Sequence, residues 1–255
     1  MKIRLLESLT ISISVALCLA GAASAMTDDW VGDIGKRGIG LTLSVSTGKT
    51  AASGNDFEGY YFYNDVMKNL PIERERQDGK SYMYEVNAAG QRVSKFVCSY
   101  PAKDPRGHFK GKIDGEVMVG TWSKMDGSNS TPFYLSKQSG VGAEGEKRYA
   151  MVGVKDDAAF EKKVQKFRTA VLTGDKKTAA SMINFPISCN VSGKSRNIAN
   201  SAQFIKNFDR IVNPEYKKAM QEAVPHNLFV NDQGVMLGNG QVWFESDGTV
   251  KTLNN

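Results

Sequence analysis

The chain has 255 residues, and its 33 Lys and Arg against 27 Asp and Glu give a formal net charge of +6. The basic residues are spread along the chain and not gathered in a block, which argues against nucleic-acid binding and favours a solvated basic surface. No His-x-His, Cys-x-x-Cys or His-Glu-x-x-His spacing occurs, so the sequence predicts no metal site and no cofactor.

Residues 1–25 have the three parts of a secretory signal peptide. A basic start at residues 1–4 precedes an apolar run over 9–22, and Ala23-Ser24-Ala25 has the A-x-A form of a cleavage site. The apolar run is too short for a permanent membrane span. We therefore expect cleavage near Ala25 and a mature protein, of net charge +5, in the periplasm or secreted.

Residues 26–139 are predicted to form an antiparallel β domain. Short apolar or alternating runs are separated by glycine and aspartate turns, and no helical period of adequate length occurs. We expect a meander that curls into a small barrel or an open sandwich. Glycine followed by an aromatic residue, as in Gly59-Tyr60 and Gly120-Thr121-Trp122, resembles the up-and-down barrels of the lipocalin and avidin type, from which we transfer no ligand.

A β-hairpin is predicted around Asp78-Gly79, a sequence typical of a two-residue turn. Its strands would run over residues 72–76 and 81–86. A turn of this length would place Glu75 opposite Tyr82 on the neighbouring strand.

Aromatic side chains are the candidate binding residues of this domain. Strand alternation puts Tyr61 and Tyr63 on the same side of one strand, and Tyr82 and Tyr84 on the same side of another. Tyrosines on an exposed sheet face suit a protein interface or carbohydrate stacking. The alternative is that both sides of the sheet are packed. Adjacent carboxylates such as Asp28-Asp29 are interpreted as solvent-facing charge.

Residues 140–155 are predicted to link two domains. Gly140, Gly142 and Gly145 lie close together with little to bury, and formally match G-x-G-x-x-G. A dinucleotide site needs a helix to begin there, whereas residues 148–152 are typical of a strand. No nucleotide site is therefore predicted.

Residues 156–255 change to a helical period and are predicted to form an α+β domain. Asp156 can cap a helix that buries apolar residues at positions 160, 164, 167 and 171, and Gly174 can end it. Further helices are expected to begin near Asp175, Ser201 and Pro214. A hairpin over 185–198 should separate the second helix from the third, and a strand meander over 228–253 should close the chain.

The order helix, helix, strand pair, helix, helix, strand meander resembles the cone-shaped α+β fold of ketosteroid isomerase and nuclear transport factor 2. The resemblance implies a curved sheet around the helices and a pocket used as an active site, a binding site or a dimer surface. The catalytic carboxylates of that superfamily match no position here. Segments 185–188 and 237–244 also resemble bacterial envelope proteins, which implies a compartment and no activity.

Two cysteines, Cys98 and Cys189, remain after signal removal, and an exported protein meets an oxidising compartment. A disulfide between them would close a loop of about 90 residues and contribute about 4 kcal/mol in the chain-entropy model. The alternative is two separately buried thiols, because each cysteine lies in an apolar, strand-like stretch.

No catalytic set is apparent in the sequence. It has no G-x-S-x-G elbow, and its two histidines, His108 and His226, lie at a turn and a helix end. The leading hypothesis is an exported, non-catalytic protein that binds an envelope protein or glycan, as an inhibitor, immunity or assembly factor, with Trp243 as a further candidate binding residue. The alternatives are a hydrolase or isomerase with a pocket in the C-terminal domain, or a carrier of a small apolar ligand. No oligomeric state is predicted.

Overall fold

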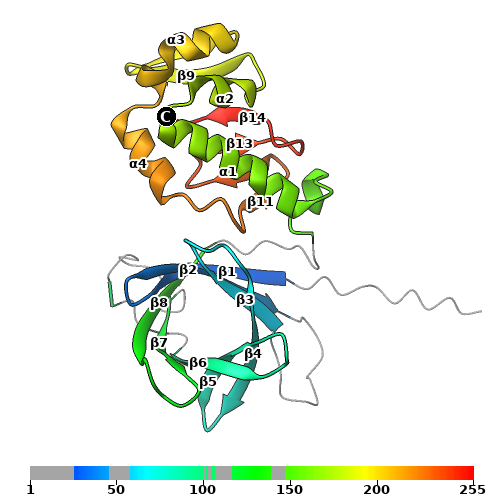
Figure 1. Ribbon diagram of the computed structural model, residues 1–255, viewed down its shortest axis with the longest axis vertical. Coiled ribbons are helices and arrows are strands. Elements are labelled where there is room, and N and C mark those ends of the chain that lie inside the picture. The colour runs from blue at the N-terminus through cyan, green and yellow to red at the C-terminus, as the bar shows by residue number, and fades with distance from the viewer. Residues whose placement is uncertain (1–25, 46–57, 100–101, 103–104, 107–116, 139–146) are drawn as a thin grey trace, which may run out of the picture.

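The computed structural model describes residues 26–45, 58–99, 102, 105–106, 117–138 and 147–255. It has the predicted α+β class, with a β-barrel followed by a part built of helices and short strands (Figure 1). The predicted signal peptide and the glycines at 140–145 lie outside the described residues. Within the described ranges, no helix combines the length and the apolar character needed to cross a membrane.

The N-terminal part is a closed, eight-stranded antiparallel barrel. Each strand pairs with the next, and the last pairs back to the first, which confirms a barrel over an open sandwich. The strands are β1 (Met26–Ile34), β2 (Arg37–Val45), β3 (Glu58–Tyr63), β4 (Leu70–Gln77), β5 (Lys80–Val86), β6 (Arg92–Ser99), β7 (Val117–Lys124) and β8 (Thr131–Lys137).

Large side chains fill the barrel. Tyr61, only 1% exposed, packs edge-on against Phe96 at a centroid distance of 5.2 Å. The fully buried Leu135 belongs to the same core cluster. Close strand approach requires glycine at position 120, where a Cβ would lie 1.9 Å from the carbonyl oxygen of Val97. The barrel is therefore a packed core.

The hairpin between β4 and β5 confirms the predicted turn and register. Asp78 and Gly79 both have positive φ angles, of 51° and 75°, as a type I′ turn requires. Glu75 pairs with Tyr82 across the strands, as expected.

The C-terminal part follows the predicted element order. Its elements are η1 (Ala150–Val152), α1 (Asp157–Thr173), α2 (Lys176–Ser181), β9 (Ile187–Val191), β10 (Lys194–Ile198), α3 (Ser201–Ile211), α4 (Pro214–Glu222), β11 (Phe229–Asn231), β12 (Gly234–Leu237), β13 (Val242–Phe244) and β14 (Val250–Leu253).

Helix α1 forms for the reasons that the sequence indicates. The Asp156 side chain accepts a hydrogen bond from the Ala159 amide at 2.9 Å, and Gly174 ends the helix with a φ of 75°. The apolar face of α1, with Phe160 and Phe167, lies in the core of this part.

The C-terminal sheet has the order β11-β12-β13-β14 and two different faces. One face packs Val235 and Phe244 into the helical core. The opposite face carries a row of half-buried apolar residues, Phe229, Met236 and Trp243, which are cross-strand neighbours. Of these three residues, Phe229 also packs against the C-terminal core.

The strand predicted over residues 148–152 is wrong. Ala150–Val152 is a single 3₁₀ turn that Gly153 ends with a φ of 89°. The reason is the burial of Tyr149, which has no exposed surface and packs with Phe160 and Val154 in the C-terminal core. A turn allows this ring to be inserted where an extended strand would carry the chain past the core.

The proposed disulfide is not formed. Cys98 and Cys189 are both free and buried, Cys98 in the barrel core and Cys189 in the C-terminal core. Burial raises the pKa of the Cys98 thiol to about 12 and that of Cys189 to about 11. The alternative of two separate buried thiols is the one that the structure adopts.

Candidate binding cleft

Strands β1, β2 and β3 turn the outer face of the barrel toward the C-terminal part (Figure 1). Because side chains alternate along a strand, the outward residues form rows across the sheet. One row consists of Asp29, Thr42 and Tyr60, and the next of Val31, Gly40 and Phe62. The first row is polar and the second is largely apolar.

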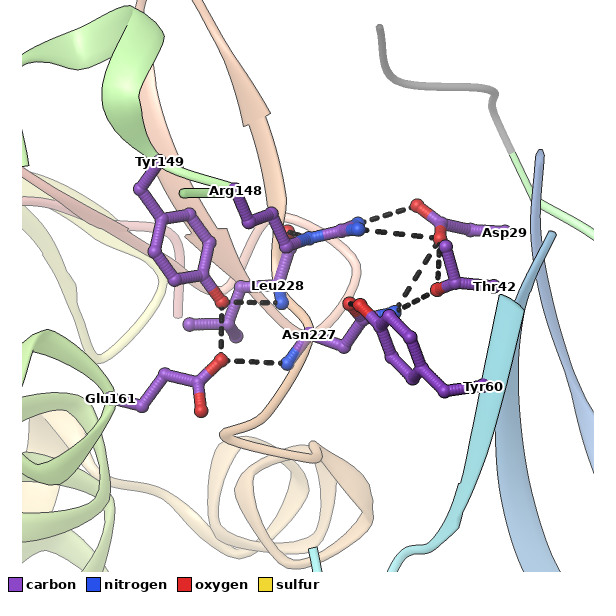
Figure 2. A network of polar contacts seen from close by, with 8 residues as sticks. All are labelled: Asp29, Thr42, Tyr60, Arg148, Tyr149, Glu161, Asn227 and Leu228. Carbon is purple, nitrogen blue, oxygen red and sulfur yellow. Dashed lines mark hydrogen bonds and ion pairs between the residues drawn. The ribbon is translucent and has the colours of Figure 1, made fainter. Parts of the chain in front are cut away.

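The polar row holds an arginine of the C-terminal part (Figure 2). Arg148 forms an ion pair with Asp29, and its Nε donates to the carbonyl oxygen of Leu228 at 2.7 Å. Thr42 Oγ1 donates to Asp29 Oδ1 at 2.7 Å. Asp29 is only 7% exposed, so its interpretation as solvent-facing charge is wrong. Burial by itself would lower the pKa of Arg148, but the charge and hydrogen bonds of Asp29 raise it overall.

Asn227, also from the C-terminal part, bonds to the same row (Figure 2). Its Nδ2 donates to Thr42 Oγ1 at 2.8 Å, and its Oδ1 accepts from the Tyr60 hydroxyl at 2.6 Å. Asn227 has a φ of 54°, a left-handed conformation that asparagine adopts more readily than most residues. Burial raises the pKa of Tyr60, which therefore stays a hydrogen-bond donor.

Glu161 of α1 supports this arrangement from within the C-terminal part. Its Oε1 accepts from the Tyr149 hydroxyl at 2.6 Å and from the Asn227 amide at 2.9 Å (Figure 2). Its Oε2 lies 2.5 Å from His226 Nδ1, and His226 Nε2 lies 2.8 Å from Asn69 Oδ1 on the barrel. Contacts thus cross between the two parts at three residues of the C-terminal part, Arg148, Asn227 and His226.

These contacts hold the two parts in one arrangement. The groups are mostly buried, and a buried polar group is costly unless it is hydrogen-bonded. Tyr149 also accepts from the Leu228 amide at 2.8 Å, so its hydroxyl both donates and accepts. The interface is specific, because a different docking would leave Asp29 and Thr42 of the barrel without their partners in the C-terminal part.

A cleft of about 610 Å³ lies beside the network, with walls from both parts. This volume and this place, between domains, are typical of ligand sites. Its apolar side chains include Val31, Phe62, Val224, Phe229 and Met236. Its uncharged polar side chains include Asn64, Gln138, Asn227, Asn239 and Gln241. The absence of a side chain at Gly40 leaves space for the Phe62 ring, since a Cβ there would lie 2.2 Å from that ring.

The tyrosines predicted as binding residues lie away from the cleft lining. Tyr61 packs inside the barrel, and Tyr63 lies under the guanidinium of Arg37, 3.6 Å from the ring centroid. Tyr82 and Tyr84 stack on each other on the outer side of the barrel, at a centroid distance of 6.0 Å. The four tyrosines thus form two pairs, Tyr61 with Tyr63 and Tyr82 with Tyr84, and neither pair lines the cleft.

Trp243 lies closer to the cleft. Its ring contacts that of Phe229 edge-on, at 6.4 Å between centroids, and Phe229 itself lines the cleft. Reasoning from the sequence missed Asp29, Arg148 and Asn227, which carry the network. The available signal was Arg148 and Tyr149 directly after a glycine-rich stretch, where two large side chains can anchor one part to the other.

The described residues contain no group of three or more His, Cys, Asp or Glu that could hold a metal ion. The fold and the site define a two-part protein, a closed barrel joined to an α+β part by a buried polar network that borders a cleft. Comparison with models of protein families, with curated proteins and with solved structures finds no match for this chain.

The Glu161 carboxylate is expected to make stability depend on pH. Burial by itself would raise the pKa of Glu161. The hydrogen bond and the charge of His226, together with hydrogen bonds from Tyr149 and the Asn227 amide, lower this pKa overall below the ordinary 4.5. As the pH falls, Glu161 of the unfolded chain therefore takes up a proton before Glu161 of the folded protein does. The contribution of Glu161 to the free energy of unfolding is complete above about pH 4.5 and is lost as the pH falls through the folded pKa.

Urea denaturation of the wild type and of Glu161→Gln across this range tests the expectation. The difference in free energy of unfolding should be largest near neutral pH and should shrink in acid. A difference that stays constant with pH would contradict a linked proton at Glu161.

Proposed function

We propose that this protein is an exported, non-catalytic binding protein that holds a polypeptide segment of an envelope partner in the cleft between its two parts. The observation that carries the proposal is the lining of the cleft, where apolar side chains and side-chain amides from both parts face one preformed space. The export step rests on the features of residues 1–25.

The amides favour a polypeptide over a purely apolar ligand. Asn64 and Gln138 come from the barrel, and Asn239 and Gln241 from the turn between β12 and β13. A side-chain amide both donates and accepts hydrogen bonds, as does each peptide group of an extended segment. Between them, Val31 and other apolar side chains offer surface to the side chains of such a segment.

The charged groups at the cleft favour binding over catalysis. Both ring nitrogens of His226 are engaged, one by Glu161 and one by Asn69. Asp29 is engaged by Arg148 and Thr42. Groups committed in this way hold the interface and have little capacity left for proton transfer to a ligand.

The C-terminal part is further proposed to have the cone-shaped architecture of the ketosteroid isomerase and nuclear transport factor superfamily. The order of its elements from α1 to β14 supports this proposal. In this view the apolar row of Phe229, Met236 and Trp243 is the face of the sheet that a ligand meets.

A Val31→Trp variant should abolish peptide binding, because an indole at this position would occupy the cleft. Val31 is 45% exposed and lines the cleft, so the larger ring needs no space in the barrel core. The matched control is Val93→Trp, since Val93 is 37% exposed, lies on β6 and does not line the cleft.

The measurement is selection of random peptides displayed on filamentous phage against the immobilised chain of residues 26–255. We expect peptides retained by the wild type and by Val93→Trp, and released by Val31→Trp. If no peptide is retained, or if Val31→Trp retains the same peptides, the cleft is not a peptide site.

A further inference from the structure

Glu222 is the last residue of α4, and it lines the cleft. The C-terminal end of a helix carries partial negative charge from its free carbonyl groups, so a carboxylate there is unfavourable and a cation is favourable. No basic residue lies in the last turn of α4. Among the described residues, Glu222 takes part in no ion pair.

One cation already contacts the end of α4, through main-chain carbonyl groups and not through this carboxylate. Arg168 of α1 donates to the carbonyl oxygens of Met220 and Gln221, both at 2.7 Å. These bonds satisfy two of the last carbonyl groups of the helix. They leave the Glu222 carboxylate at the wall of the cleft without a partner of opposite charge in the described part of the chain.

The other charges of the cleft lining compensate one another. Asp29 pairs with Arg148, and His226 lies against the carboxylate of Glu161. The formal charge left on the lining is therefore the negative charge of Glu222, although the chain as a whole carries +6.

We infer that the segment bound in the cleft carries one basic side chain, lysine or arginine, with apolar neighbours. This inference rests on the proposed function and names the chemistry of its ligand. The ammonium or guanidinium group would lie against the Glu222 carboxylate, which attracts a cation. Val224, two residues after Glu222, and Phe229 and Met236 would receive the flanking apolar side chains.

Two pools of synthetic hexapeptides test this inference. Both pools have uncharged residues at the variable positions and blocked ends; one pool has a fixed lysine, and the other has Nε-acetyl-lysine at the same position. The fraction of each pool retained by the immobilised protein is measured by mass spectrometry. Four proteins are compared: the wild type, Glu222→Gln, the control Glu215→Gln in the first turn of the same helix, and Val31→Trp.

The wild type and Glu215→Gln should retain the lysine pool about five-fold better than the acetyl-lysine pool, and this ratio should fall to near one in Glu222→Gln. Equal retention of both pools by the wild type, with loss in Val31→Trp, would overturn the basic-residue inference and leave peptide binding standing. A lysine preference that survives in Glu222→Gln would overturn the role of Glu222. Retention of neither pool would count against the proposed function itself.

Discussion

Replacing Asp29 with asparagine is expected to lower the free energy of unfolding by about 3–5 kcal/mol, since it leaves the Arg148 guanidinium buried without a counter-charge. The side chains of both residues are largely buried, at 10% and 13% exposed. Asparagine keeps one side-chain oxygen that can still accept from Thr42 and Asn227, so the loss falls on the ion pair with Arg148. The effect should appear first as loss of docking between the barrel and the C-terminal part.

Urea denaturation followed by tryptophan fluorescence measures this loss, because Trp30 and Trp122 report on the barrel and Trp243 on the C-terminal part. The matched control is Asp28→Asn. Asp28 pairs with Lys137 at 2.7 Å, but both side chains are partly exposed, so a change below about 1 kcal/mol is expected.

A double variant distinguishes an unpaired charge from general damage to the interface. Asp29→Leu combined with Arg148→Met removes both charges, and should be less destabilising than Asp29→Asn alone. A double variant that is less stable than the single one would mean that the hydrogen bonds around the pair, and not the lone charge, dominate the loss.

Truncating Tyr149 to alanine is expected to cost about 3–5 kcal/mol, comparable to other large-to-small changes in a core. The ring is fully buried against Phe160, and the hydroxyl bonds to both Glu161 and the Leu228 amide. The variant would therefore leave a cavity, a buried amide and a carboxylate with fewer partners.

Two further variants divide this loss into its parts. Tyr149→Phe keeps the ring and removes the hydroxyl, so about 1–3 kcal/mol is expected from the unsatisfied Leu228 amide. Met151→Ala is the control, since Met151 is 53% exposed and should change stability by less than about 0.5 kcal/mol. Equal stability of Tyr149→Phe and the wild type would show that the hydroxyl adds nothing to the stability of the protein.

The sequence predicts the elements of this protein better than it predicts their docking. The turn at Asp78-Gly79 and helix α1 form as expected, because their signals are local: two positive φ angles, an aspartate cap and a terminal glycine. The sequence is compatible with both a closed barrel and an open sandwich, because closure depends on the pairing of β1 with β8, whose residues are about 100 positions apart.

The cleft could not be predicted for the same reason. Asp29, Arg148 and Asn227 are far apart in the sequence, and each has a common local interpretation as surface charge or a loop polar residue. Only their burial together distinguishes them. Conversely, the aromatic character of the tyrosines predicts a binding role, although Tyr61 packs inside the barrel.

The long separation of these partners has a consequence for the order of folding. The hydrogen bond of Asp29 with Arg148 spans 119 residues, and that of Thr42 with Asn227 spans 185. Contacts so distant form slowly, because the entropy of closing a long loop opposes them. The outer face of the first strands is therefore completely covered only after nearly the whole chain has been synthesised. A chain emerging N-terminus first would keep this polar row in water until its last quarter arrives, so the interface is the final step that commits the molecule to its folded form.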